Sequence, residues 1–263
     1  MNKKQQEEQR RQEDLALMQG LLWVAGAVVL EVLLFFINRY AFDFDATMQG
    51  VTLAETVRGL LGVMRWAGLA AFVGGGIMLG MKLNKGGKTV WAAVAAVVGV
   101  VILTCAHVAL KYQSTGMRML YLLVPVLGGL ALSYFIYQRD FFLAALPGVA
   151  AVLGLWFVRV SGVGLEALVT MLVCVVVLIA ALKLKKDGGV LKLGEKSLRI
   201  LPEKADCAVV LISGVIAVAV QAVAAVAVLA VSAAVGSALA YYLIFAMGAW
   251  LFALLVYHTV KML

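Results

Sequence analysis

The sequence predicts an all-α membrane protein, a polytopic bundle of eight transmembrane helices with the N-terminus and the C-terminus in the cytoplasm. Hydrophobic residues make up 64% of the chain and charged residues only 14%. The mean hydropathy of +1.03 lies well outside the composition of soluble domains. The apolar residues also fall in long stretches, each close to the ~20 residues with which a helix crosses ~30 Å of hydrocarbon.

Eight such stretches follow one another along the chain. They are predicted at residues 15–38, 60–81, 89–110, 119–137, 141–158, 164–182, 207–230 and 239–257. A β-barrel is excluded because its spanning segments have ~10 residues of alternating polarity. In lipid, a helix satisfies its own backbone groups. We therefore divide the chain into a charged cytoplasmic tail at 1–14 and a transmembrane domain at 15–263.

The orientation follows from the positions of the 22 Lys and Arg residues, because cytoplasmic loops carry an excess of both. With the N-terminus inside, most of them are cytoplasmic, including a cluster in the loop at 183–206. We expect this loop to form a short hairpin or turn, and to bind anionic lipid headgroups or a cytoplasmic protein partner. The length and short loops suggest a bacterial plasma membrane.

The net charge of +8 is explained by these loop residues, and we expect no nucleic-acid partner because no loop is long enough to form a binding domain. The cysteines Cys105, Cys174 and Cys207 are widely separated. They are predicted to be free thiols that pack as small apolar residues. Neither a metal site nor a cofactor is expected, and no motif supplies a catalytic nucleophile with its base.

Charged residues inside the predicted spans form the candidate site. Glu31 precedes the outer end of the first span by seven residues, and Arg65 follows the outer end of the second span by five. At matching depths the two side chains could pair and relieve the cost of an isolated charge in lipid. Asn38 and Arg58 each lie seven residues away on the same helix faces. This polar seam is either a structural lock between two helices or a site for a proton, an ion or a solute.

Further polar residues are predicted near the outer helix ends. His107, Arg159 and Glu166 could form an outward-facing vestibule together with Asp43 and Asp45. A histidine near the membrane interface is also explained as an interfacial anchor.

Gly76 and Gly80 form a GxxxG motif in the second span, with Gly74 and Gly75 beside it. Such a motif lets a neighbouring helix approach closely, so we expect a helix-packing surface there.

Three classes of function remain open. A permease-like protein for a small solute or ion would use the polar seam. A non-catalytic scaffold or assembly partner would use the glycines of the second span and the 183–206 loop. A membrane enzyme acting on a lipid-linked substrate would need convergent acidic or histidine side chains at one interface, and the residue pattern favours the first two classes over this one.

Overall fold

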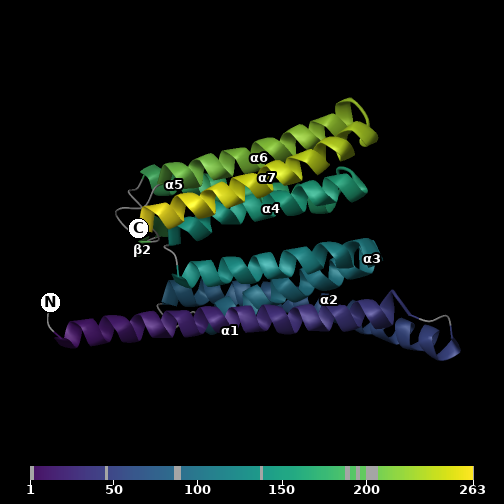
Figure 1. Cartoon of the computed structure of the whole chain (residues 1–263), viewed down its shortest axis with the longest axis horizontal. Helices are drawn as coiled ribbons and strands as arrows, with labels where there is room; N and C mark the ends of the chain where they lie inside the picture. Colours follow the sequence, from purple (N-terminus) through teal and green to yellow (C-terminus); the bar gives the residue numbers. More distant parts are fainter. Residues whose placement is uncertain are drawn as a thin grey trace. The chain divides into compact units, whose positions relative to one another are not determined.

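The computed structural model describes residues 3–44, 47–85, 90–136, 139–186, 190–193, 196–199 and 207–262. Over these ranges the chain forms seven helices and one short hairpin (Figure 1). The helices are α1 (Lys3–Ala41), α2 (Met48–Lys85), α3 (Val90–Ile136), α4 (Arg139–Ser161), α5 (Leu165–Lys186), α6 (Cys207–Ala230) and α7 (Ala233–Met262). All seven are long and apolar enough to cross a membrane. The predicted helical fold, with several helices of membrane-spanning length and apolarity, is therefore confirmed.

The structure differs from the predicted eight spans in α3, which joins the third and fourth spans. A straight helix of its 47 residues would measure ~70 Å, more than twice the hydrocarbon thickness. Gln113 breaks the helix with φ 47° and ψ −129°, and the chain turns back on itself there (Figure 1). The turn requires glycine at Gly116, where a Cβ would lie 2.5 Å from the carbonyl oxygen of Val108. Residues 90–112 and 114–136 therefore form two arms.

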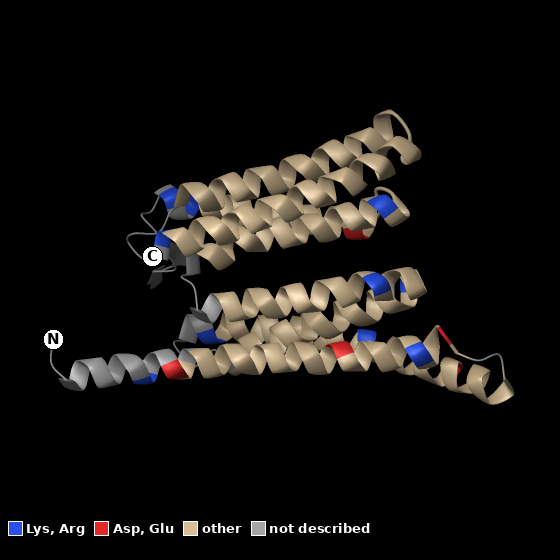
Figure 2. Ribbon diagram, in the orientation of Figure 1, with Lys and Arg blue, Asp and Glu red and all other residues tan. Residues whose placement is uncertain are grey.

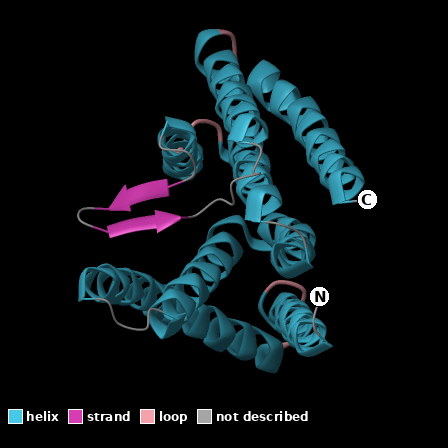
Figure 3. Cartoon of the chain, turned by 90° about the vertical axis from the view of Figure 1, so that its left-hand side faces the viewer, coloured by secondary structure: helices cyan, strands magenta, loops and turns pink. Residues whose placement is uncertain are grey.

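The 183–206 loop contains an antiparallel hairpin of β1 (Val190–Leu193) and β2 (Lys196–Arg199), seen in Figure 3. Val190 pairs with Arg199 and Leu193 with Lys196. The rest of the loop beyond α5, and Asp45 of the predicted vestibule, lie outside the described residues. Figure 2 shows that Lys and Arg gather near the ends of the helices, and that the middle stretches are largely uncharged.

The chain divides into two compact units, Leu21–Gly129 and Met1–Gly20 with Leu130–Leu263. We call them the α1–α3 unit and the α4–α7 unit. In the α4–α7 unit, α4 packs against α5, α6 and α7. Its membrane-length stretch is 67% buried, against 17–39% for the other three helices. Helix α4 is therefore the core of this unit.

Close backbone packing in the α1–α3 unit joins α2 to the first arm of α3. A Cβ added at Gly75 would lie 2.6 Å from the amide nitrogen of Ala96, and one at Gly68 would lie 2.7 Å from that of Leu103. At the predicted motif residues Gly76 and Gly80, a Cβ would meet no described atom within 4 Å. Within the predicted glycine cluster, the close contact therefore falls at Gly75, and Gly76 and Gly80 do not take part in it.

Candidate functional site

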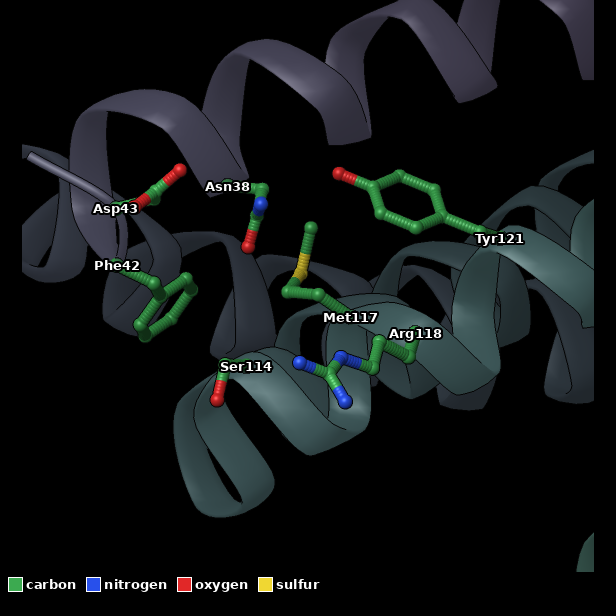
Figure 4. Close-up of a pocket in the computed structure, with 7 residues that line it drawn as sticks. All are labelled: Asn38, Phe42, Asp43, Ser114, Met117, Arg118 and Tyr121. Atoms are coloured by element: carbon green, nitrogen blue, oxygen red, sulfur yellow. The ribbon is translucent and has the colours of Figure 1, made fainter.

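A pocket of about 230 Å³ opens within the α1–α3 unit, beside the end of α1 (Figure 4). Its lining comes from two segments. Asn38, Phe42 and Asp43 lie at or just beyond the end of α1, and Ser114, Met117, Arg118 and Tyr121 lie on the second arm of α3. The chain after α1 is held in place because the amides of Phe42 and Asp43 both donate to the carbonyl of Asn38, at 3.0 and 2.9 Å.

Arg58 positions the segment that forms one wall of this pocket. Its Nε donates to the carbonyl of Ala41 at 3.0 Å. Its guanidinium also lies 5.4 Å from the ring centre of Phe42 and 5.7 Å from that of Phe44. Such cation–π contacts stabilise by ~0.5–1 kcal/mol when exposed and more when desolvated. Arg58, predicted as part of the polar seam, thus holds the pocket wall by its contacts with the α1 end.

Most polar side chains of the pocket have no partner among the described residues. The hydroxyl of Tyr121 donates to the carbonyl of Leu34 over 3.4 Å, a long bond. The side chains of Asn38, Asp43, Ser114 and Arg118 make no hydrogen bond or ion pair with any other described residue. Met117, fully buried, supplies an apolar part of the lining. Several donors and acceptors therefore converge on one cavity without protein partners, which is typical of a ligand site.

Glu31 lies on α1, the helix that carries the pocket residue Asn38, and precedes Asn38 by two turns or ~10 Å. Its Oε2 is buried and has no hydrogen-bond partner. Tyr121, which lines the pocket, donates to the carbonyl of Leu34. The hydrogen bond therefore connects the pocket lining to the turn of α1 that follows Glu31.

The predicted ion pair between Glu31 and Arg65 is not formed among the described residues. The guanidinium of Arg65 instead lies 5.4 Å from the ring centre of Trp66, its neighbour in α2. Neither a salt bridge nor a hydrogen bond joins Glu31 to Arg65 in the part of the chain that the structure describes. The polar seam is therefore not a neutralised lock in this structure, and Glu31 retains an unpaired buried oxygen.

The predicted vestibule residues belong to different units. His107 is half-buried in the first arm of α3. Arg159 and Glu166 belong to the α4–α7 unit, where the Arg159 guanidinium lies 4.4 Å from the ring centre of Tyr241. The Arg159 carbonyl also accepts a hydrogen bond from Ser237 at 3.1 Å. The contacts of Arg159 stabilise the α4–α7 unit. Among the vestibule residues that the structure describes, only Asp43 lines the pocket of the α1–α3 unit.

A second group of polar residues is buried in the α4–α7 unit, and its members satisfy one another. The Gln221 side chain accepts from Thr170 at 3.3 Å and donates to the sulfur of Cys174 at 3.1 Å. Ser213 donates to the carbonyl of Ala144 and accepts from Trp250 at 3.2 Å. These bonds link all four helices of the unit, so their role is structural.

His258, near the end of α7, is only partly satisfied. Its Nδ1 lies 2.9 Å from the carbonyl of Leu254, and its buried Nε2 has no partner. Phe141 and Tyr257 contact the imidazole edge to face. Across the described residues, no three His, Cys, Asp or Glu side chains gather in a way that could hold a metal ion.

Sequence reasoning missed the α3 wall of the pocket. Ser114, Met117, Arg118 and Tyr121 are spaced three, four and seven residues apart, which places them on one helix face. The repeat of polar residues on that face was the available signal. Comparison with protein families, with characterised proteins and with solved structures finds no match to this chain.

Proposed function

We propose that this protein is a permease-like membrane protein that binds a small solute or ion in the pocket of the α1–α3 unit, with Glu31 as the coupled charge. The observation that carries the proposal is the buried, unpaired Oε2 of Glu31, two turns along α1 from a pocket lined by polar side chains. Ionisable groups within membrane spans are costly and mark ion pathways and proton relays. A buried carboxylate without a partner can bind a proton or a cation, because either one neutralises its charge.

The topology proposed with this function has eight spans, both termini in the cytoplasm and a location in the bacterial plasma membrane. The reversal of α3 at Gln113 supports the count, because each of its arms alone has a spanning length. The distribution of Lys and Arg supports the orientation. With this orientation the pocket faces outward, and the β1–β2 hairpin faces the anionic cytoplasmic leaflet or a protein partner.

The proposal is tested with the purified full-length protein and its Glu31→Gln variant. In proteoliposomes under an imposed membrane potential, a pH-sensitive dye should report proton uptake by the parent protein above that of empty vesicles. The variant should show none. In detergent, the melting temperature of the parent should depend on pH or on added Na⁺ or K⁺, and that dependence should vanish in the variant.

Glu55→Gln is the matched control, because Glu55 is an exposed carboxylate of α2 that does not line the pocket. It should behave as the parent in both assays. If Glu31→Gln matches the parent in proton uptake, and also in the pH and ion dependence of melting, the proposal is wrong.

A scaffold or assembly role is the second candidate. It is favoured by the exposed faces of α1 and α2, whose membrane-length stretches are only 11% and 17% buried. Gly74, Gly76 and Gly80 leave one stretch of α2 open, with no atom within 4 Å of an added Cβ. Lipid or another protein covers such a face in a membrane. Gly76→Leu and Gly80→Leu should abolish co-purification of a partner helix protein if this role holds, and should leave proton uptake unchanged.

A further inference from the structure

The two walls of the α1–α3 pocket carry opposite charges. Asp43 follows α1 on one wall, and Arg118 lies on the second arm of α3 on the other. Both side chains are exposed, and neither forms an ion pair with a described residue. In Figure 4 the two charged groups come from opposite segments and do not meet. The pocket therefore holds one unpaired negative and one unpaired positive group.

Each charged wall of the pocket also carries an uncharged polar side chain that suits the same kind of ligand group. Ser114 lies on the wall of Arg118, and Figure 4 shows the guanidinium extending toward it. A guanidinium with an adjacent hydroxyl offers hydrogen-bond donors to a carboxylate or phosphate. Asn38 lies on the wall of Asp43, where a carboxylate and an amide oxygen can accept hydrogen bonds from an ammonium group.

From this arrangement we infer that the pocket binds a small zwitterion, with its anionic group on the Arg118 wall and its ammonium group on the Asp43 wall. The inference rests on the proposed function and names its substrate class. An anion alone would pair with Arg118 but face the repulsion of Asp43, and a cation alone would face that of Arg118. A molecule that carries both charges satisfies both walls.

The size of the pocket fits a molecule of this class. Its volume of about 230 Å³ is several times the ~30 Å³ that a water molecule occupies in the liquid. That space is enough for an amino-acid-sized solute or for the headgroup of a zwitterionic lipid. Both present an ammonium and an anionic group a few bonds apart, so the same chemistry could reach the pocket from solution or from the bilayer.

The binding test compares three probes of equal carbon number: β-alanine as the zwitterion, propionate as the anion and propylamine as the cation. Binding to the full-length protein is measured by calorimetry in nanodiscs of phosphatidylglycerol. We expect β-alanine to bind at least about tenfold more tightly than either single-charge probe, a difference of ~1.4 kcal/mol. Equal binding of the three probes, or none by β-alanine, would overturn the inference.

Single substitutions test the two walls. Arg118→Gln and Asp43→Asn should each weaken β-alanine binding about tenfold and remove the preference over one single-charge probe. Arg39→Gln and Glu55→Gln are the controls, because both residues are exposed and neither lines the pocket. A protein in which both wall variants bind as the parent does would contradict the inference, and elution as a single symmetric peak confirms that each variant is folded.

Nanodiscs of phosphatidylethanolamine separate the two sources of the ligand. If a lipid headgroup occupies the pocket, this zwitterionic lipid should compete and weaken β-alanine binding relative to phosphatidylglycerol. If the ligand is a soluble molecule, β-alanine should bind equally in both. Loss of proton uptake in Glu31→Gln without any zwitterion binding would reject this inference alone, and zwitterion binding without a role for Glu31 would reject the coupling proposal alone.

Discussion

The effect of Glu31→Gln on stability tests whether Glu31 is unpaired. If the carboxylate has no partner, the substitution should raise the melting temperature, and if it forms an ion pair, the substitution should lower it. A buried polar group without a hydrogen bond costs ~1–3 kcal/mol, and more when it is charged. Glu31→Gln keeps the size of the side chain and removes its charge. The glutamine amide still lacks a partner, so only the extra cost of the charge is removed, and we expect the free energy of unfolding to rise by ~1–2 kcal/mol near pH 8. At ~2–4 °C per kcal/mol, the melting temperature should rise by roughly 2–8 °C.

The assay is a double-mutant cycle of Glu31→Gln and Arg65→Gln, followed by thermal melting in detergent across pH. Because the Arg65 guanidinium lies over Trp66, the two substitutions should be additive within ~0.5 kcal/mol. The stabilisation by Glu31→Gln should shrink as the pH falls, because protonation removes the same charge in the parent. Added Na⁺ or K⁺ should also reduce the difference if a cation neutralises the carboxylate.

An ion pair would give a different result in the same cycle. Breaking a buried pair by removing one partner costs ~3–5 kcal/mol. Glu31→Gln would then lower the melting temperature, and the addition of Arg65→Gln would restore it. That outcome would refute the assignment of Glu31 as an unpaired site and would leave a structural lock in its place.

The remaining predictions concern packing and topology. Gly75→Leu should destabilise the α1–α3 unit by several kcal/mol because a Cβ would lie within 3 Å of Ala96. Gly76→Leu should leave the melting temperature unchanged. Equal effects of the two substitutions would contradict the packing of α2 through Gly75. Gly154→Ala should lower stability by ~1–3 kcal/mol because its Cβ would meet both the Gln221 side chain and the Thr170 hydroxyl. Gln221→Ala should therefore relieve only part of that clash in the double variant. Reporters fused within 183–206 and after the C-terminus should both be cytoplasmic, and an external signal from either would overturn the eight-span topology.

The sequence predicted the spanning segments well because length and hydropathy act along one dimension. It placed a boundary between 110 and 119, where the structure has the Gln113 reversal within α3. It could not determine helix rotation, which depends on packing between segments. Of the predicted glycines Gly74, Gly75, Gly76 and Gly80, the structure brings Gly75 into close backbone contact and leaves the other three open, a choice that helix rotation makes. Glu31 and Arg65 were predicted to pair from their positions along the two spans alone, and these positions do not fix the directions of the side chains.

The state of hydrogen bonding separates the two polar regions of this protein in physical terms. Around Gln221 nearly every polar side chain has a protein partner, so the folding reaction itself accounts for those residues. At Glu31 a buried carboxylate oxygen has no such partner, and folding alone pays a cost to keep it there. Such a cost is recovered when a proton or a cation binds. His258 Nε2 in the α4–α7 unit is also buried without a partner, but Glu31 alone of the two lies on the helix that carries the pocket residue Asn38 and leads into Asp43, neither of which has a side-chain partner among the described residues.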